Sequence, residues 1–517
     1  MSETAVRQTP ADCVARLLQR EGPAGLQRLT GCFALIAIDT ADCRLLATRD
    51  RSGGRTLYFN ASKGQITLAT RPAWIMHIAR LPFRESGHYL AAHFALQSAP
   101  PAGSTAFEDV QELMPGELLQ FENDTLSLSP QPLSLEADPA LYADPVASFR
   151  ELLTNAVHTA LPDSGDVAVM LSGGLDSGPM AMLADSKLAQ SNQALKPVSW
   201  SLNAFPEADE AQWILHYDQA LRSAPIITDL SDRLPFGDLD TAYSSENLPS
   251  YNAFNALIEH CYQESAEQGC RVILNAAVGD RIYPAPRLLL IDLLRRRRWR
   301  ALGQELRGLI RREGLSGFPR DAAVRYGLGR WVPGRQREGT RRAWLTPLAQ
   351  SIQAEEEPST QLVCHTYPDY AQQLFGPAMA FGQAHTNEHA QRFGIDRRDP
   401  YQNEALLRFM LHLPVRSTWQ DGWDKAIMRE AMRGLIPEPI RHKRRTGLLH
   451  ALFRSGLRAY RQDVRELLLD QNESWQQYVQ KTAVEEALSG KPGAPDALIA
   501  LCVGYLRWLQ HWQGRIR

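Results

Sequence analysis

Apolar positions near the start of the chain first follow a helical spacing and then an alternating one. Val14, Leu17 and Leu18 lie at roughly helical intervals, so residues 11–28 are expected to form an amphipathic helix. Short apolar runs separated by turn residues then follow at 33–38, 44–47, 56–60, 65–70, 110–113 and 117–121. This texture predicts a small antiparallel β-rich unit. Residues 127–144, which contain Pro and Ser, are expected to be a linker.

After Pro145, apolar strands alternate with helical segments. The expected order is helix 147–160, strand 167–171, helix 178–189, strand 198–202, helix 251–268 and strand 272–274. Such alternation predicts a parallel sheet covered by helices on both faces, with ligand-binding loops at the carboxyl ends of its strands. From about residue 285 the chain is expected to be almost wholly helical. The expected fold class is therefore α/β, with an antiparallel β-rich domain over residues 1–140. A parallel-sheet domain with a largely helical C-terminal part is expected over residues 145–517.

The composition indicates an ordinary globular protein, and its net charge does not indicate a highly charged partner such as nucleic acid. The 517 residues are 44% hydrophobic and 22% charged, and the formal net charge of −2 gives no basic field that would point to nucleic acid. The seven cysteines are an odd number without a C-x-x-C pair, which fits reduced thiols and hence the cytoplasm. No apolar run of about 18 residues occurs, so neither a membrane span nor a secretion signal is expected.

The segment Leu171–Ser177 carries the pattern with the clearest chemistry. It reads Leu-Ser-Gly-Gly-Leu-Asp-Ser and lies between an expected strand and an expected helix. Gly173 and Gly174 let main-chain N–H groups approach an anion, the serine hydroxyls add donors, and the helix presents its positive end to the same point. Such a loop suits pyrophosphate, and Asp176 offers a carboxylate for Mg²⁺. The alternative is an ordinary Gly-Gly turn whose Ser and Asp residues cap the helix.

The sequence from Ser172 to Ser177 resembles the ATP-pyrophosphatase loop of asparagine synthetases, β-lactam synthetases and lasso-peptide cyclases. Later segments match the same family in order: Ser199–Leu202 with Asp209-Glu210, Val272–Leu274 with Gly279-Asp280, Gly394–Pro400, and Lys425–Ala431. The resemblance implies an ATP-pyrophosphatase domain that uses ATP and Mg²⁺. The ATP-binding residues that it implies are Leu171, Ser172, Gly173, Gly174, Asp176, Ser177 and Leu202. The implied metal-binding residues are Asp176 and Asp280, and the implied catalytic residues are Lys425 and Arg445.

The first domain is similar to class II glutamine amidotransferase domains, which implies an Ntn-type fold. The matching residues are Gly31–Leu35, Asp39, Arg49-Asp50, Leu57-Tyr58 and Pro115-Gly116. A working glutaminase of that class needs an N-terminal cysteine, whereas Ser2 follows Met1 here. Cys13 lies within an expected helix, where packing explains it better than nucleophilic attack. The domain is therefore expected to be degenerate, to hydrolyse no glutamine, and to serve structure or a partner.

Two positions depart from the family pattern. Arg281 stands where the family usually has a glutamate. The R-x-K of the family is aligned with residues 443–445, which puts Arg445 in the place of a catalytic-type lysine. A guanidinium can stabilise phosphate charge through two hydrogen bonds but is a poor base. Lys425, at the head of its expected helix, is expected to matter more for turnover than Lys443.

The reaction that the resemblance implies has two steps. A carboxylate and Mg²⁺-ATP give an acyl-adenylate and pyrophosphate, and an amine then attacks and releases AMP. The stretch from Leu413 to Pro437 looks most like lasso-peptide cyclases, which implies a ribosomal precursor peptide whose N-terminal amine is joined to an Asp or Glu side chain. A leader peptidase or leader-binding protein is the partner that this implies. The alternatives are an asparagine-synthetase-like enzyme that uses ammonia or a small-molecule amine, and a non-catalytic peptide- or nucleotide-binding scaffold.

Two further groups of residues have ordinary explanations. The arginines at 295–298, 300, 311 and 312 fit a solvated helix face, with docking of an acidic peptide as the alternative. His385, Glu388 and His389 lie one helical turn apart, but no metal site is expected because a third ligand is not evident.

Overall fold

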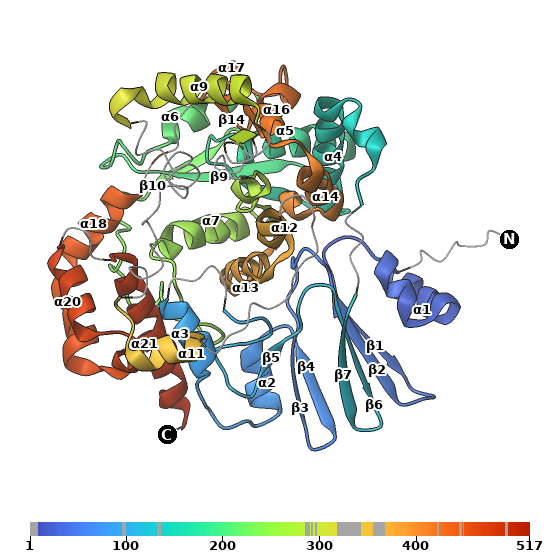
Figure 1. Ribbon diagram of the computed structural model, residues 1–517, viewed down its shortest axis with the longest axis vertical. Helices are drawn as coiled ribbons and strands as arrows, with labels where there is room; N and C mark the ends of the chain where they lie inside the picture. Colours follow the sequence, from blue (N-terminus) through green and yellow to red (C-terminus); the bar gives the residue numbers. More distant parts are fainter. Residues whose placement is uncertain are drawn as a thin grey trace.

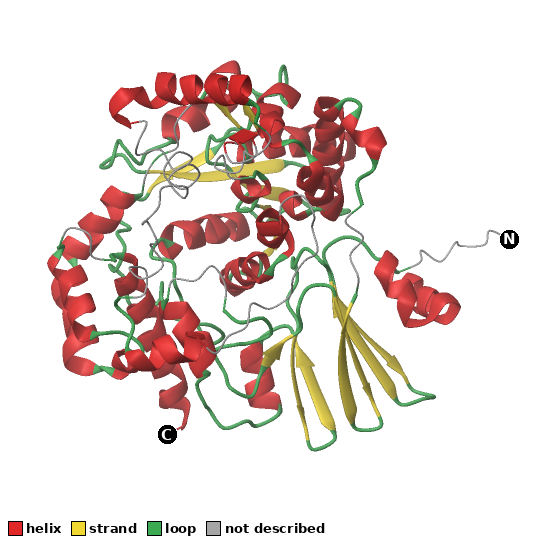
Figure 2. Ribbon diagram, viewed as in Figure 1, coloured by secondary structure: helices red, strands yellow, loops and turns green. Residues whose placement is uncertain are grey.

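The computed structural model combines an antiparallel β-rich unit, a parallel sheet and a large helical part (Figures 1 and 2). It describes residues 9–95, 100–131, 136–284, 290, 293–294, 297–317, 343–354, 368–420, 423–443, 447, 449–491 and 495–516. The antiparallel strands come first in the chain, the parallel strands follow, and helices dominate the C-terminal part. The expected α/β fold class is therefore confirmed.

Two small antiparallel sheets form the N-terminal unit. One has the order β1-β2-β6-β7, and the other has the order β4-β3-β5. Their strands are β1 (Ala34–Asp39), β2 (Arg44–Arg49), β3 (Tyr58–Ser62), β4 (Gln65–Ala69), β5 (Gln111–Glu112), β6 (Glu117–Glu122) and β7 (Thr125–Pro130). Apolar side chains from both sheets share one core, which includes Ala47, Phe59 and Leu119. The linker expected from residue 127 is wrong at its start, because β7 pairs with β6 as a hairpin.

Helices accompany the two sheets in this unit. They are α1 (Pro10–Glu21), the 3-10 helix η1 (Gly22–Arg28), α2 (Pro72–Ile78) and α3 (Gly87–Phe94). Leu26 of η1 packs with Leu46 and Leu118 on the first sheet. The helix expected over residues 11–28 is thus present as α1 and η1. Cys13 is exposed on α1, so the expectation that it packs in a core is wrong.

The central sheet has five parallel strands in the order β10-β9-β8-β11-β12. The strands are β8 (Val167–Met170), β9 (Leu195–Ser201), β10 (Ile226–Asp229), β11 (Val272–Leu274) and β12 (Asp396–Arg398). The chain leaves β8 toward β9 and returns to the other side of β8 with β11. This reversal places a crevice at the carboxyl ends of β8 and β11, which is where ligands bind in open α/β sheets.

Helices and short turns occupy the chain between and before these strands. Before β12 they are η2 (Pro139–Tyr142), α4 (Pro145–Ala160), α5 (Ser177–Leu188), η3 (Ala189–Ser191), α6 (Ala211–Ile214), η4 (Leu215–Tyr217), α7 (Asn255–Glu267), η5 (Gly279–Ile282), α9 (Trp299–Gly317), α11 (Pro347–Ala354), α12 (Pro368–Phe375) and α13 (Pro377–Arg392). Figure 1 shows α13 near the centre of the molecule, between the parallel sheet and the N-terminal strands.

The chain after β12 is mainly helical, as expected. Its elements are η8 (Pro400–Gln402), α14 (Glu404–His412), α15 (Val415–Thr418), the hairpin β13 (Trp419–Gln420) and β14 (Trp423–Asp424), α16 (Ala426–Ala431), α17 (Glu438–Arg441), α18 (His450–Ala459), α19 (Arg461–Arg465), the π-helix η9 (Glu466–Gln471), η10 (Ser474–Gln477), α20 (Lys481–Ser489) and α21 (Ala497–Ile516). In the part of the chain that the structure describes, no helix is long and apolar enough to cross a membrane.

The largest core joins the two ends of the chain. Tyr89 and Phe94 of α3 lie in the same apolar cluster as Tyr505, Trp508 and Trp512 of α21. This core runs across the domain boundary expected at residues 140–145, so the N-terminal unit and the C-terminal helices depend on each other for burial.

Candidate active site

The loop from Leu171 to Asp176 connects the central strand β8 to α5. Ser172 N donates to Ser177 Oγ over 3.0 Å, and the two serine hydroxyls lie 3.0 Å apart. Gly173 has φ +63°, and a Cβ there would lie 2.8 Å from Ile214 N. Only glycine combines this left-handed conformation with so close an approach. The loop therefore holds its main chain in a fixed curve at the amino end of a 12-residue helix, where N–H groups bind anions.

Leu171 of the loop and Leu202 on the neighbouring strand end are both buried. Leu171 continues the sheet, since its N–H donates to the main-chain oxygen of Val198 over 3.0 Å. Leu202, just after β9, is also buried, and its N–H donates to Asp209 Oδ1 over 3.0 Å. Both leucines thus lie at the carboxyl ends of neighbouring strands, on the edge that carries the loop. Their side chains belong to apolar cores.

Asp176, Asp280 and Lys425 come together from three distant segments. Lys425 Nζ donates to Asp176 Oδ2 and lies 2.5 Å from Asp280 Oδ1. Asp176 ends the loop, and Asp280 lies in η5 after β11. A Cβ at Gly279 would lie 2.7 Å from Asp176 Cβ, so a glycine is needed where the two acidic loops meet.

The electrostatics of this group follow from its burial. Burial raises the pKa of Asp176 to about 6, with attraction to Lys425 opposing the rise and repulsion by Asp280 adding to it. For Lys425, burial alone lowers the pKa, but the attraction of Asp176 and Asp280 outweighs it and the net pKa is raised. The ammonium therefore stays charged. Lys425 itself has φ +50°, a strained position for a residue with a side chain, just after the β13–β14 hairpin.

The two aspartates fit a magnesium ion. Asp176 Oδ1 is buried and has no hydrogen-bond partner among the described residues. The Asp280 side chain is 83% exposed, so the pair can be reached from solvent. No group of three His, Cys, Asp or Glu side chains with metal-ligand geometry occurs in the described residues. Mg²⁺ does not require one, because it commonly binds through one or two carboxylates together with substrate phosphates and water.

Lys443 is a second ammonium at the loop. Its Nζ donates to the main-chain oxygen of Gly173 over 3.2 Å and to Glu210 Oε1 over 2.9 Å. Its side chain is only 5% exposed and its Nζ lies 5.2 Å from the centre of the Trp213 ring. The pattern R-x-K also occurs at Arg441-His442-Lys443, two residues before residues 443–445. That signal could have identified Lys443 from the sequence.

Two residues behind the loop were not identified from the sequence. Tyr401 OH donates to the main-chain oxygen of Asp176 over 2.8 Å. Asp399 Oδ2 accepts from Val278 N over 2.9 Å, two residues before Asp280. Burial raises the pKa of Asp399 to about 6, and nearby Arg397 opposes that rise. Asp399 lies within the matched segment Gly394–Pro400 and Tyr401 follows it directly, but the resemblance implied no role for either residue.

Some of the remaining predicted residues lie outside the part of the chain that the structure describes, and others contact neighbouring elements. Arg445, Arg295 and Arg296 lie outside the described residues. The main-chain oxygen of Arg281 accepts from Gln373 Nε2 over 2.5 Å, which ties the turn after Asp280 to α12. His389 Nδ1 lies 2.5 Å from Glu259 Oε1, and Glu388 Oε1 accepts from Ser245 Oγ over 2.7 Å.

Comparison with known families adds to this geometry. The model of the asparagine synthase family matches residues 148–513, and that of the glutamine amidotransferase domain matches residues 3–131. The chain belongs to the asparagine synthase family. Members of this family are ATP-dependent, amide-forming ligases, and the chain is accordingly an enzyme of that class.

The sequence identity between this member of the asparagine synthase family and its individual relatives is low. It is 21% identical over 439 residues to asparagine synthetase [glutamine-hydrolyzing] 3 of Bacillus subtilis, which covers 81% of this chain and 67% of the relative. It is 29% identical over 184 residues to amidase chyE of Penicillium rubens, covering 34% and 27%. It is 24% identical over 222 residues to asparagine synthetase [glutamine-hydrolyzing] 2 of Bacillus subtilis, covering 40% and 30%. The last two alignments span less than a third of the relatives.

Proposed function

We propose that this chain activates a carboxylate as its acyl-adenylate with ATP and then transfers the acyl group to an amine. The observation that carries the proposal is the convergence of two ammonium groups, one buried and one 13% exposed, and two carboxylates at one glycine-rich loop. Lys443 contacts the loop main chain, and Lys425 pairs with Asp176 and Asp280. Fixed positive charge in a site screened from water stabilises the negative charge that builds on phosphates.

Each group has a separate task in this proposal. The main-chain N–H groups and hydroxyls from Ser172 to Ser177 hold the pyrophosphate portion of ATP, and Leu171 and Leu202 border the nucleoside. Asp176 and Asp280 would hold Mg²⁺, which neutralises phosphate charge when bound. Lys443 and Lys425 bind phosphate oxygens and stabilise the departing pyrophosphate. Arg445 is proposed to add a guanidinium to the same phosphates.

For the substrate, we propose a ribosomal precursor peptide that is closed into a lasso-type macrolactam. The support is the resemblance of the stretch from Leu413 to Pro437 to lasso-peptide cyclases. The amine is then the N-terminus of the peptide, and the carboxylate is an Asp or Glu side chain. Holding both ends of one molecule close raises their effective concentration. A leader peptidase or leader-binding protein of the same pathway is the proposed partner.

The second candidate is amide formation with ammonia or a small-molecule amine. The alignment over 81% of this chain with asparagine synthetase 3 favours it. The two candidates share the adenylation step and differ in the amine.

The test is ATP–pyrophosphate exchange by the full chain, followed by mass spectrometry of the products. Candidate precursor peptides with an Asp or Glu in the first ten or so residues are compared with free aspartate and glutamate plus ammonia. Loss of one water from a peptide, with no free N-terminus left, supports the macrolactam. Amidation of a free amino acid supports the second candidate. Absence of exchange with every carboxylate, in protein that also fails to bind MgATP, would falsify the adenylation proposal.

The two lysines provide matched variants for this test. Lys443→Met is expected to lower ATP affinity and to slow exchange about 100-fold, or roughly 3 kcal/mol, with an unchanged Mg²⁺ requirement. Lys425→Met is expected to slow exchange more than Lys443→Met does, and to reach half-saturation at lower Mg²⁺, because the ammonium no longer competes for Asp176 and Asp280. Exchange within threefold of wild type in both variants would contradict these roles. An exposed lysine, Lys481→Met, is the control.

A further inference from the structure

Asp399 reaches both acidic loops of the site from behind. Its Oδ2 accepts from Val278 N over 2.9 Å, at the turn that leads to Asp280. Its Oδ1 accepts from Tyr401 N over 3.1 Å, and Tyr401 OH donates to the main-chain oxygen of Asp176 over 2.8 Å. One carboxylate thus restrains the two loops, with a separate oxygen for each.

Arg397 forms an ion pair with this carboxylate, and Asn387 in turn holds the guanidinium of Arg397. Arg397 Nη1 lies 3.8 Å from Asp399 Oδ2, and Arg397 Nε donates to Asn387 Oδ1 over 3.0 Å. Asn387 is on α13, and its Nδ2 donates to the main-chain oxygen of Gly54 in the N-terminal unit over 3.0 Å. All three side chains are buried. Buried charges and amides are costly unless paired, so each partner restricts the position of the next.

In the N-terminal unit, these contacts reach the loop from Asp50 to Gly54, which its own hydrogen bonds hold in place. Asp50 Oδ1 accepts from Ser52 Oγ over 2.7 Å and from Gly54 N over 2.8 Å. The main-chain oxygen of Ser52 accepts from Gln402 Nε2 over 3.2 Å. Gly53 has φ +73°, and a Cβ there would lie 3.1 Å from Ala380 of α13. The loop is therefore fitted closely onto the synthetase part.

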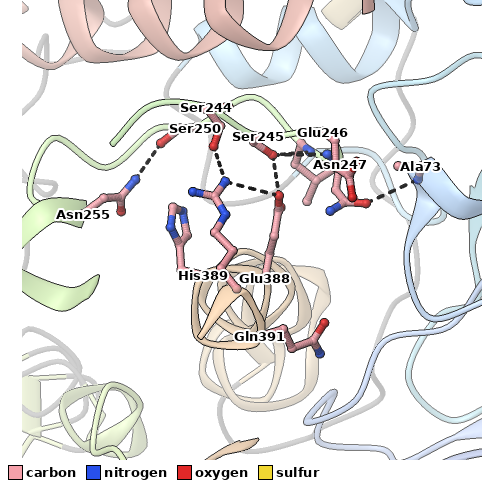
Figure 3. Close-up of polar contacts among 12 residues, drawn as sticks. Ala73, Ser244, Ser245, Glu246, Asn247, Ser250, Asn255, Glu388, His389 and Gln391 are labelled. Carbon is pink, nitrogen blue, oxygen red and sulfur yellow. Dashed lines mark hydrogen bonds and ion pairs between the residues drawn. The ribbon is translucent and has the colours of Figure 1, made fainter. Parts of the chain in front are cut away.

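A second set of contacts fixes α13 against the N-terminal unit. Figure 3 shows Glu388 and His389 pointing from α13 toward the segment that carries Ser244, Ser245 and Asn247. Ser245 Oγ donates to Glu388 Oε1 over 2.7 Å, and Asn247 Oδ1 accepts from Ala73 N of α2 over 3.3 Å. The helix that carries Asn387 therefore contacts the N-terminal unit directly at Gly54 and is linked to α2 through residues 245–247.

We propose that Asp399 is a positioning residue that sets the spacing of Asp176 and Asp280 for MgATP, and that the N-terminal unit holds Asp399 in place through Gly54, Asn387 and Arg397. The inference rests on the proposed adenylation function and extends it. It gives the glutamine amidotransferase-like domain a part in the synthetase reaction that does not involve glutamine.

Calorimetric titration of the full chain with ATP tests this inference, once in excess Mg²⁺ and once in EDTA. The ratio of the two affinities measures how well the aspartate pair is placed for the ion. Asn387→Ala removes both contacts of the amide and is expected to reduce this ratio at least tenfold, with the affinity in EDTA kept within twofold. Asp399→Asn is expected to reduce the ratio likewise, because an amide cannot accept hydrogen bonds with both of its ends. A general loss of folded protein would lower the binding stoichiometry instead.

Arg55→Ala is the matched control. Arg55 lies in the same loop and forms an ion pair of 2.6 Å with Asp396, whose carboxylate also pairs with Arg398. For Arg55→Ala, the ratio of the ATP affinity in Mg²⁺ to that in EDTA is expected to stay within twofold of wild type. An unchanged ratio in Asn387→Ala, or an equal loss in Arg55→Ala, overturns the inference while the proposed function stands. If Asn387→Ala does not fold, Asn387→Asp carries the test, since it keeps the acceptor for Arg397 and loses the donor to Gly54. Absence of MgATP binding by the wild type would instead remove the proposed function, and this inference with it.

Discussion

At the scale of single residues, buried histidines make the fold sensitive to acid. His93 of α3 is 8% exposed and lies against Tyr89 and Phe94, with ring centres 6.5 Å and 5.2 Å away. Burial lowers its pKa to about 4, with a hydrogen bond to the main chain of Leu501 opposing the change. In the unfolded chain its pKa is about 6.5. The unfolded state therefore binds the proton first as the pH falls, and stability is lost between about pH 6.5 and pH 4.

His93→Gln is expected to remove this part of the acid sensitivity. Between pH 7.5 and 5.5 the wild-type free energy of unfolding should fall by about 1.3 kcal/mol more than that of the variant. Urea unfolding of both proteins at the two pH values measures the difference. His450→Gln, at a position that is 58% exposed, should show the wild-type dependence. Equal pH dependence of wild type and His93→Gln would mean that His93 is not neutral and buried in the folded state.

Residues of the site that are adjacent in sequence could be predicted, and those that meet only through folding could not. The loop from Leu171 to Ser177 can be recognised in the sequence because glycines, hydroxyls and a carboxylate occur together. Lys443 was ambiguous, since the R-x-K pattern can be aligned at 441–443 or with residues 443–445. Its contact with the main-chain oxygen of Gly173 favours the alignment at 441–443. Asp399 and Tyr401 contact the two acidic loops from more than 100 residues away in sequence, and no local pattern shows which residues fold against those loops.

At the scale of elements, strands were predictable where burial imposes apolar side chains on both faces. β8 and β11 are such strands. β12 reads Asp-Arg-Arg and was not expected, because its side chains satisfy ion pairs instead of filling a core. β10 is four residues long and was also missed. Short or charged strands follow from tertiary pairing, which local pattern does not record.

The junction between β11 and η5 provides the prediction at this scale. A Cβ at Gly279 would lie 2.7 Å from Asp176 Cβ and Cγ, so Gly279→Ala must push the two acidic loops apart. We expect the affinity for MgATP to fall tenfold or more, about 1.4 kcal/mol, with thermal unfolding near that of the wild type. Calorimetry and circular dichroism measure the two quantities.

Gly303→Ala is the control for this substitution. Gly303 lies within α9, and a Cβ there would meet nothing within 4 Å. Alanine favours a helix interior by up to about 1 kcal/mol over glycine, so this variant should bind MgATP normally. Normal binding by Gly279→Ala would show that the loops can separate without harm.

At the scale of the whole molecule, α21 completes a core that α2 and α3 begin. Leu498, Tyr505 and Trp508 of α21 are fully buried in the cluster that contains Tyr89 and Phe94. Deletion of residues 495–517 is expected to expose α3 and to cause aggregation or loss of a cooperative unfolding transition. Deletion of residues 1–21 should be tolerated far better, because α1 has no buried residue. Limited proteolysis and thermal unfolding of the two truncated proteins compare them. Cooperative unfolding of the first deletion, with α3 still protected, would contradict a shared core.

The packing of α3 against α21 also limits the order in which parts of the protein can fold during translation. Tyr505 OH donates to Glu85 Oε2 over 2.8 Å, between residues 420 positions apart. A ribosome that adds about 5 to 20 residues per second needs roughly 20 to 80 s to pass from one to the other. Throughout that interval the apolar faces of α2 and α3 lack their cover. The core around α2 and α3 is therefore closed only when α21 emerges, and the nascent chain depends on protection from aggregation until then.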